Sequence, residues 1–460
     1  MFCGPRPVWT TDTVIQQHSP IVMTYARPLC LGLLAVLLCL GSDAATAQSS
    51  SWSDAITKKA ADLQPQVIEW RRDIHQNPEL SNRETRTAKK VATYLRDLDM
   101  EVETGVSKTG VVGTLEGGKP GPVIALRADM DALPVKERVD VPFASSDSSM
   151  YNGEKVPVMH ACGHDTHVAM LMGAAEILAS MREELPGTVK FLFQPAEEGA
   201  PKGERGGADV MVEEGALSDP DVDTVFGIHI NSQTEVGTIK YRPGPIMAAS
   251  DVFRINVTGE QTHGSTPWDG VDPIVTASQI VNNLQTIVSR QSELTKEPAV
   301  VSVGKIEGGV RNNIIPESAR MVGTIRTLDT AMQRDIHDRI RRVATSTAEG
   351  MGAEVDVEID RGYPVTKNDP SLTETLKPTL ERVADTLVKT DPITGAEDFS
   401  YFARRVPGLY VFVGGMPPDM DPEDAPSHHT PDFFIDESGM QYGVRAYAQI
   451  ATDYLSAHAE

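Results

Sequence analysis

Cysteine is scarce in this chain of 460 residues, which contains only four. Cys3, Cys30 and Cys39 lie in or before a segment with the character of an export signal. Cys162 is therefore the only cysteine expected in the mature chain, where it has no partner for an intramolecular disulfide. Because 40% of the residues are hydrophobic, a chain of this length can form its core without disulfides.

Positive charge is also in short supply. The chain has 42 Lys and Arg against 65 Asp and Glu, which gives a formal net charge of −23. Nucleic acids and anionic membrane surfaces require clustered basic residues, so neither is an expected partner. We attribute the acidic balance mainly to solubility.

Long hydrophobic runs are absent apart from Leu29–Leu40, which is too short for a comfortable transmembrane span. Arg27 precedes this run, and the small-x-small sequence Ala45-Thr46-Ala47 follows it. This order is typical of a Sec signal cleaved after Ala47. We therefore expect a periplasmic or secreted protein without a membrane anchor after cleavage of residues 1–47.

The first 22 residues do not fit such a signal, whereas translation from Met23 would place the signal at the N-terminus. Met23 is therefore a candidate translation start, which would leave residues 1–22 outside the protein. A lipoprotein anchor is not expected either, because Cys39 follows Leu38 rather than a small residue.

Apolar strands alternate with helices in the first half of the mature chain, and no internal repeat interrupts them. This alternation predicts an α/β sheet covered on both faces. The expected helices are 53–75, 84–98, 164–181 and 206–214, and the expected strands are 122–127, 188–193 and 224–230.

The pattern changes near residue 247 to strand-helix-strand-strand-helix-strand, which is the ferredoxin-like order. We predict an α/β catalytic domain with a mixed sheet, formed by residues 48–246 and 362–460, and an inserted α+β domain at 247–361. The insert's expected strands are 252–257, 300–306, 321–326 and 354–359, and its helices are 271–289 and 332–349. The last segment is expected to contain a helix at 371–389, a strand at 409–413 and a helix at 439–457.

Potential metal ligands gather in the stretch Met159–Asp165. Cys162, His164 and Asp165 offer a thiolate, an imidazole and a carboxylate on a loop that enters a predicted helix. A helix N-terminus stabilises anions and lowers a thiol pKa, which suits a ligand. For Cys162 alone, a buried structural cysteine beside the helix start is an equally good interpretation.

More ligand types follow later in the chain. Glu197 and Glu198 come after a predicted strand, where adjacent side chains point to opposite sides, so one could bind a metal and the other a water. His229 ends an apolar run and resembles a strand-end ligand, although a core histidine would be the commoner interpretation if it stood alone. One member of the His428-His429 pair is expected to bind metal.

Other polar residues have less clear roles. Asp129 and Asp131 follow a buried strand, and they fit carboxylates that orient metal-bound imidazoles about as well as they fit an acidic turn. His75, His337 and His458 lie on predicted helices without partner residues, so we interpret them as surface histidines.

Taken together, the chain resembles the M20 metallopeptidases, of the aminoacylase and carboxypeptidase-G type. It is most similar to their amidohydrolase branch, with hippurate hydrolase, N-acyl-amino-acid amidohydrolases and plant auxin-conjugate hydrolases. The resemblance covers roughly residues 55–455. It rests on 71–79, Asp129/Asp131, Cys162/His164, 194–199, 227–229, His263, 323–327 and 395–400.

The resemblance implies a site for two divalent metals, with Mn, Zn, Co and Ni all acceptable to the donors. Its implied ligands are Cys162, His164, Glu198, His229 and His429 rather than His428. Glu197 would be the general base, and His263 would stabilise the oxyanion, often in the partner subunit's site. Asn313 would contact the substrate and Arg326 its carboxylate. Asp129, Asp131 and Asp165 would not bind metal themselves but would orient the metal-binding side chains.

The implied activity is metal-dependent hydrolysis of N-acyl amino acids, with the inserted domain as lid and dimerisation domain and a homodimer as a possible assembly. Three alternatives remain open. Cys162 could be a nucleophile with a histidine base, the fold could be a non-catalytic binding module, or the substrate could be a dipeptide or the C-terminus of a peptide.

Overall fold

The computed structural model describes residues 34–459, with side chains from Trp52 onward. The predicted export signal, residues 1–47, lies outside the residues whose side chains are described. Among the described helices, none combines the length and the apolar character needed to cross a membrane. Ser49–Glu460 form one compact unit.

The larger of its sheets has eight strands and is mixed. Its four central strands β6, β3, β7 and β18 run parallel, and β1, β2 and β8 are antiparallel to their inner neighbours. The order is β1 (Glu101–Val106), β2 (Gly110–Glu116), β6 (Pro186–Gln194), β3 (Lys119–Asp129), β7 (Thr224–Glu235), β18 (Gly408–Met416), β8 (Thr238–Tyr241) and β17 (Thr386–Lys389).

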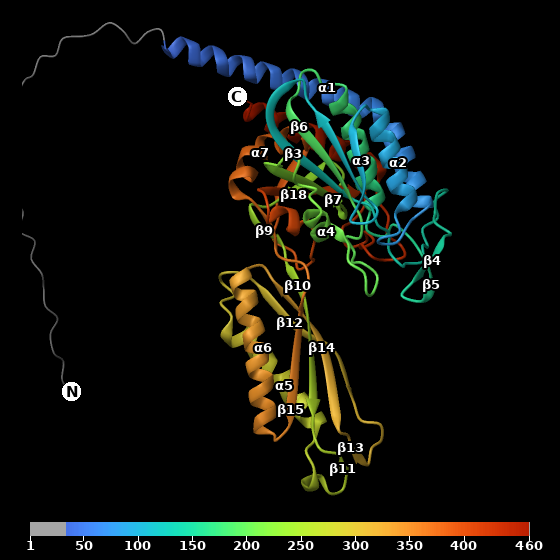
Figure 1. The fold of residues 1–460 in the computed structure, drawn as a ribbon, viewed down its shortest axis with the longest axis vertical. Coiled ribbons are helices and arrows are strands. Elements are labelled where there is room, and N and C mark those ends of the chain that lie inside the picture. The colour runs from blue at the N-terminus through green and yellow to red at the C-terminus, as the bar shows by residue number, and fades with distance from the viewer. Residues whose placement is uncertain (1–33, 460) are drawn as a thin grey trace, which may run out of the picture. The chain divides into compact units, whose positions relative to one another are not determined.

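Helices cover both faces of this sheet (Figure 1). In β18, Leu409 and Val411 contribute to one hydrophobic core and Tyr410 and Phe412 to another, so alternate residues face opposite sides. The first core includes α1 (Leu34–Gln76), α2 (Thr85–Asp97), α3 (His164–Ala179), α7 (Pro370–Val383) and α9 (Met440–Ala457). The second includes α4 (Gly207–Glu213) and α8 (Ser400–Ala403).

The four-stranded sheet has its own core. Its order is β12 (Ala299–Gly308), β14 (Ser318–Thr327), β10 (Ala249–Thr258) and β15 (Glu354–Arg361), with every neighbour antiparallel. Buried and partly exposed residues alternate along β10, as expected for a sheet covered on one face. The helices α5 (Pro273–Thr286) and α6 (Thr330–Gly350) supply that cover (Figure 1).

Short elements complete the unit. A ladder of β9 (Gly244–Met247) and β16 (Thr366–Asn368) lies where the chain passes between the two sheets. The remaining elements are β4 (Ser148–Tyr151), β5 (Glu154–Pro157), β11 (Thr262–His263), β13 (Ile314–Ile315), and the short helices η1 (Pro267–Asp269), η2 (Ile287–Gln291) and η3 (Glu437–Gly439).

One predicted helix extends beyond the end of the observed helix. The segment 371–389 contains α7, which ends at Val383, and then the strand β17, which pairs parallel with β8. The β-branched residues Thr386 and Val388 favour a strand, and the edge of the large sheet offers the pairing that decides the outcome. No Gly or Pro marks this change in the sequence.

Candidate metal centre and active site

The two ligand candidates nearest in sequence are placed by a glycine. Gly163 caps the N-terminus of α3 with a φ of 96°, and a Cβ there would lie 2.4 Å from Cγ2 of Ile230. Cys162 therefore ends the loop and His164 begins the helix, with no room for another side chain between them. All but two of the 16 residues of α3 are buried, so this helix is a rigid support.

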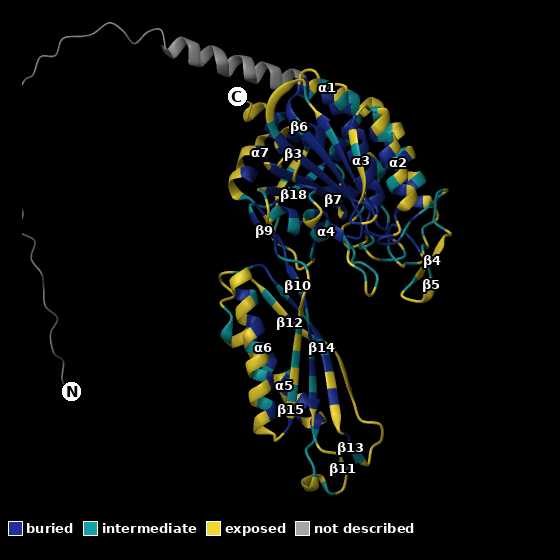
Figure 2. Cartoon of the chain, viewed as in Figure 1, coloured by how far each residue is buried: buried dark blue, intermediate teal, exposed yellow. Residues whose placement is uncertain are grey.

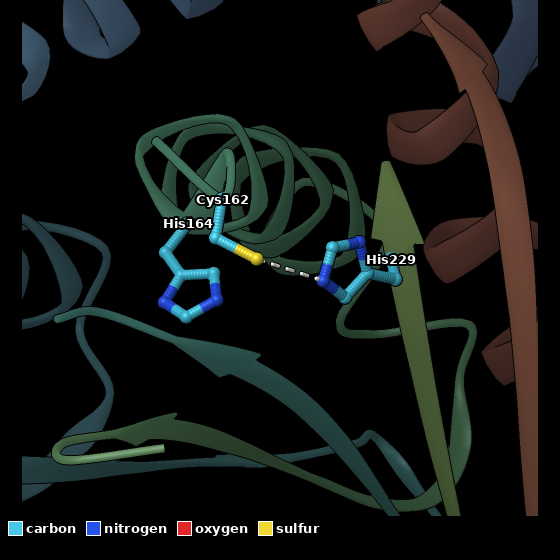
Figure 3. A group of neighbouring side chains, drawn as sticks. All are labelled: Cys162, His164 and His229. Carbon is cyan, nitrogen blue, oxygen red and sulfur yellow. Dashed lines mark hydrogen bonds between the residues drawn. The ribbon is translucent and has the colours of Figure 1, made fainter. Parts of the chain in front are cut away.

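Cys162, His164 and His229 converge on one point (Figure 3). The Sγ of Cys162 is 3.4 Å from Nε2 of His229, and one ligand atom from each of the three lies within 4.8 Å of the others. His229 lies inside β7 rather than at its end, which corrects the strand-end expectation. At this position β7 still pairs with β18, through His229 and Phe412, whereas its pairing with β3 stops at Arg127 and Gly227.

The imidazoles of His164 and His229 each use Nδ1 for a main-chain hydrogen bond and leave Nε2 facing the other ligand candidates. His229 donates from Nδ1 to the carbonyl of Ile230 at 2.5 Å, and His164 donates from Nδ1 to the carbonyl of Asp131 at 2.9 Å. Carbonyl oxygens only accept, so Nε2 carries the lone pair in the neutral form of each ring. Burial lowers the pKa of His164, but Asp129 and Asp131 outweigh it and raise this pKa to about 10, so a cation that binds there must displace the proton on Nε2. The buried Nε2 of His164 has no hydrogen-bond partner among the described residues, as expected of a metal ligand.

A second group shares Cys162 with the first and adds Glu198 and His429. Nε2 of His429 lies 3.3 Å from Sγ of Cys162 and 2.9 Å from Oε1 of Glu198. Apart from this ion-pair contact, that buried Oε1 has no hydrogen-bond partner among the described residues, which again fits a ligand. The first group offers a thiolate and two imidazoles, and the second offers a thiolate, a carboxylate and an imidazole. Two such groups joined at one cysteine suit a pair of divalent cations.

His428 differs from its neighbour because both of its ring nitrogens have partners. Nδ1 donates to the carbonyl of Cys162 at 3.0 Å, and Nε2 accepts from the amide of Ser232 at 3.2 Å. Burial lowers the pKa of His428 to about 3, so the ring is neutral. The geometry thus favours His429 as the ligand of this pair.

Asp131 holds the two adjacent glutamates in place. Its Oδ1 accepts the amide of Glu197 and its Oδ2 the amide of Glu198, each at 3.0 Å. The side chains then diverge, as expected for neighbours in the chain. Glu198 faces His429, and Oε2 of Glu197 lies 3.9 Å from Nε2 of His164.

Asp129 contacts a histidine that sequence reasoning missed. Its Oδ1 accepts from Nδ1 of His167 at 2.5 Å, and the Nε2 of His167 accepts the amide of Ile230 at 2.8 Å. His167 therefore joins β3 to β7 and has no nitrogen left for a metal. The available signal was its spacing from His164, since residues i and i+3 share a helix face. Asp129 and Asp131 are both fully buried, which does not fit an ordinary acidic turn.

Asp165 turns away from the ligands. It accepts from Nε of Arg71 at 2.7 Å and bonds Nδ1 of His75 at 2.9 Å, and Nε2 of His75 lies 3.0 Å from Glu137. The expectation of a surface position is wrong for His75, which is buried in this cluster. It is also wrong for His337, which is buried against Asp251 at 2.6 Å. His458 alone of the three is exposed.

A buried arginine pairs with three carboxylates that lie close to the site. Arg127 donates to Asp129 at 2.7 Å and to Glu397 and Asp398 at 2.9 Å each.

Burial raises the pKa of Glu197 well above its usual range, and the charges of Glu397 and Glu198 raise it further. A carboxylate that holds a proton readily is suited to general acid-base chemistry.

The thiol of Cys162 does not behave as its position at a helix start suggests. Burial raises its pKa well above the ordinary value, and the nearby charges of Glu198 and Glu197 raise it further. The expected lowering by the helix N-terminus is therefore outweighed. The thiolate form needs a cation beside it, which favours a metal ligand over a cysteine nucleophile.

The other predicted site residues lie in the segment 247–361, with His263 and Asn313 at the separate two-stranded ladder of β11 and β13 and Arg326 in β14 of the four-stranded sheet. His263 in β11 is exposed and accepts from Ser265, and the carbonyl of Asn313 accepts from Gly264 beside it. His263 and Asn313 lie beyond the end of β10 at Thr258. Arg326 pairs with Ser250 at the opposite end, where the chain leaves the larger sheet. The ten residues of β10 separate these ends by about 30 Å, so His263 and Asn313 lie together but away from Arg326.

A mixed α/β sheet with a buried Cys/His/Glu donor cluster and an adjacent glutamate of raised pKa defines a metal-dependent hydrolase. Residues 125–453 match peptidase family M20/M25/M40. The chain belongs to this family.

Similar proteins agree with this assignment. Thermostable carboxypeptidase 2 of Saccharolobus solfataricus is 42% identical over 395 residues, which cover 85% of this chain and 96% of the relative. N-acetylcysteine deacetylase of Bacillus subtilis is 36% identical over 390 residues, which cover 85% of this chain and 97% of the relative. The crystal structure of Bacillus subtilis YXEP, described as a dinuclear metal binding peptidase, has a TM-score of 0.73 at 34% identity and covers 86% of this chain and 99% of that one.

Proposed function

We propose that the protein hydrolyses the amide bond of N-acyl amino acids and releases a carboxylic acid and a free amino acid. The observation that carries this proposal is Glu197, a buried carboxylate of raised pKa whose Oε2 lies 3.9 Å from the free Nε2 of His164. The similarity to an N-acetylcysteine deacetylase supports the acyl-amino-acid substrate class.

The metal ions would be held by Cys162, His164, Glu198, His229 and His429. When bound, divalent cations polarise a carbonyl and lower the pKa of a water, and this mixed donor set accepts Mn, Zn, Co or Ni. Glu197 takes the proton of the attacking water on its carboxylate and later gives it to the leaving amine. Its raised pKa allows it to hold that proton between the two transfers.

The test of Glu197 is its replacement by Gln, with the exposed Glu116→Gln as the matched control. Loss of a general base should lower kcat by about 10²–10⁴-fold. Metal content should stay at the wild-type level in both variants, because Glu197 is not among the proposed ligands. Near-wild-type turnover by Glu197→Gln would refute its assignment as the base.

Chelation separates the metal mechanism from a cysteine nucleophile. The mature protein is assayed on N-acetyl and N-benzoyl amino acids, after chelation and again after addition of Mn or Zn. We expect activity to disappear and return. Activity that survives chelation but not thiol alkylation would favour Cys162 as a nucleophile, and no activity on any amide would favour a binding module.

A peptidase activity is the second candidate, because the relative that is 42% identical is a carboxypeptidase. Both activities cleave an amide next to an amino acid with a free carboxylate. They differ in whether the other side is a simple acyl group or an aminoacyl group. A higher kcat/KM on N-acetyl amino acids than on dipeptides with the same C-terminal residue supports the amidohydrolase.

We further propose that the segment 247–361 is a lid and dimerisation domain whose His263 and Asn313 complete the site of the partner subunit. Their position beyond one end of β10, about 30 Å from the end that adjoins the larger sheet, supports this arrangement, as does the exposed side chain of His263. Mixing inactive Glu197→Gln and His263→Ala subunits should then restore part of the activity. No restoration in mixtures shown to exchange subunits would contradict it.

Export is the remaining proposal. The run 29–40 and the sequence Ala45-Thr46-Ala47 support cleavage after Ala47 and a periplasmic or secreted location. N-terminal sequencing of the protein from the exported fraction should begin at Gln48. Retention in the cytosol with the leader intact would contradict it.

A further inference from the structure

Tyr363 lies where the chain returns from the smaller sheet to the larger one. It comes two residues after the end of β15, and its carbonyl accepts the amide of Ser250 at 3.0 Å. Ser250 belongs to the start of β10, where the chain leaves the larger sheet. The backbone of Tyr363 therefore ties together the outgoing and the returning connection between the sheets.

The side chain of the same residue reaches the active site. Its hydroxyl donates a 2.5 Å hydrogen bond to the main-chain carbonyl of Glu197. Burial raises the pKa of this phenol far above its usual value, and the surrounding carboxylates Asp398 and Glu197 add to the rise, so the hydroxyl keeps its proton and acts as a donor.

The segment that carries Glu197 needs such support, because its backbone is in an uncommon conformation. Ala196 has a φ of 54°, in the left-handed region that residues other than glycine seldom occupy. The amide of Ala196 is bonded by Glu84 at 2.9 Å and the amide of Glu197 by Asp131 at 3.0 Å. Tyr363 supplies the bond on the carbonyl side.

We propose that Tyr363 is a positioning residue for the general base and that it links this base to the connection between the two sheets. With its amide fixed by Asp131 and its carbonyl by Tyr363, Glu197 has both flanking peptide groups held, and the direction of its Cα–Cβ bond follows. This inference rests on the proposed function, in which Glu197 transfers the proton.

The link has a mechanical consequence. A rotation of the smaller sheet acts on the two connecting segments, which Tyr363 and Ser250 join. Since the ring of Tyr363 extends from that junction to the carbonyl of Glu197, the rotation also moves the base. The proton acceptor would then be correctly placed in only one position of the smaller sheet.

The test replaces Tyr363 by Phe, which removes the hydroxyl and keeps the ring. The control is Tyr401→Phe, whose ring packs edge-on against Tyr363 with centroids 6.3 Å apart and whose hydroxyl makes only a 3.5 Å contact with Gly362. We expect kcat of Tyr363→Phe to fall about tenfold with KM and metal content nearly unchanged, and Tyr401→Phe to retain wild-type kinetics.

A purely structural role would change stability or KM but not kcat alone. The inference is overturned if kcat of Tyr363→Phe stays within about twofold of the wild type, or if Tyr401→Phe lowers it equally.

Hydrogen exchange over residues 195–199 provides a readout that needs no substrate. The amides of Ala196, Glu197 and Glu198 are all hydrogen bonded, so loosening of this segment speeds their exchange. We expect faster exchange in Tyr363→Phe and not in Tyr401→Phe. If the wild type cleaves no amide, the proposed function fails, and unchanged exchange in Tyr363→Phe then independently refutes the positioning role.

Discussion

The two sheets of this protein bury different kinds of side chain. The smaller sheet buries hydrophobic residues against α5 and α6, and few of its charged side chains are buried. Buried and more exposed residues alternate along β10 and β14, whereas β6 and β18 of the larger sheet are buried almost throughout (Figure 2). The larger sheet buries two hydrophobic cores and, in addition, a group of charged residues near the ends of its central strands. Burial of charge costs free energy unless each group is paired, so its concentration in one region marks where the chemistry occurs.

The smaller sheet contains one instructive exception. Asp251 is buried at the start of β10, where it contacts His337 and Gln333 from α6 and the amide of Gly362. The pair of Asp251 and His337 lies at the connection to the larger sheet and not in the centre of the hydrophobic core of the smaller sheet. Buried charge therefore follows the active site and the connection that leads to it.

The largest effect on stability is expected from Arg127→Met. This change removes the guanidinium that pairs with Asp129, Glu397 and Asp398, and it leaves three buried carboxylates behind. Loss of one partner from a buried ion pair costs about 3–5 kcal/mol. Chemical denaturation measures this loss, and a change below about 1 kcal/mol would show that the cluster neutralises itself by protonation.

A smaller effect is expected from Gly163→Ala. The new Cβ meets Cγ2 of Ile230, and the alanine backbone must adopt a positive φ. We therefore expect the free energy of unfolding to fall by about 1–3 kcal/mol and metal binding to weaken. Gly153→Ala is the matched control, because Gly153 has a φ of 92° and no atom within 4 Å of its Cβ position. Equal losses of metal in the two variants would contradict the role of the close contact.

The cluster around His75 predicts a pH dependence. Burial lowers the pKa of this histidine, but Asp165 and Glu137 more than compensate, so its net pKa is raised. Its stabilising contribution is then fully present below the unfolded pKa of about 6.5 and is lost as pH rises through the higher folded pKa. The difference in free energy of unfolding between wild type and His75→Gln should shrink from acid to alkaline pH. A difference that grows with pH would reverse the assignment.

The smallest effect is expected on the smaller sheet. Arg254 forms a partly exposed ion pair with Asp360 on the neighbouring strand β15. Because solvent screens such pairs, Arg254→Met should change the free energy of unfolding by no more than about 1 kcal/mol. Denaturation of this variant beside Arg127→Met tests the comparison of the two sheets directly, and similar losses in both would refute it.

Local patterns were enough to predict most helices and strands, and to find the residues that gather around the metal centre. Cys162 and His164 share a motif, and Glu197 and Glu198 are adjacent, so their chemistry is visible in short stretches. Asp129 and Asp131 were recognised as supporting residues, but others were missed because their partners are distant in sequence. Arg127 meets Glu397, and Tyr363 meets Glu197, only once the chain has folded.

The same reason explains the errors. The carboxylates that pair with His75 and His337 lie on other elements, so neither helix sequence reveals them. The strand β17 depends on an edge of the sheet that its own residues do not reveal.

Asp131 gives the site a common point of reference. Its carboxylate fixes the amides of Glu197 and Glu198, and its main-chain carbonyl fixes the ring of His164. A thermal displacement of Asp131 therefore carries the base and two ligands in the same direction. Their mutual separation changes less than any of their individual positions, which makes the active geometry tolerant of motion in the surrounding protein.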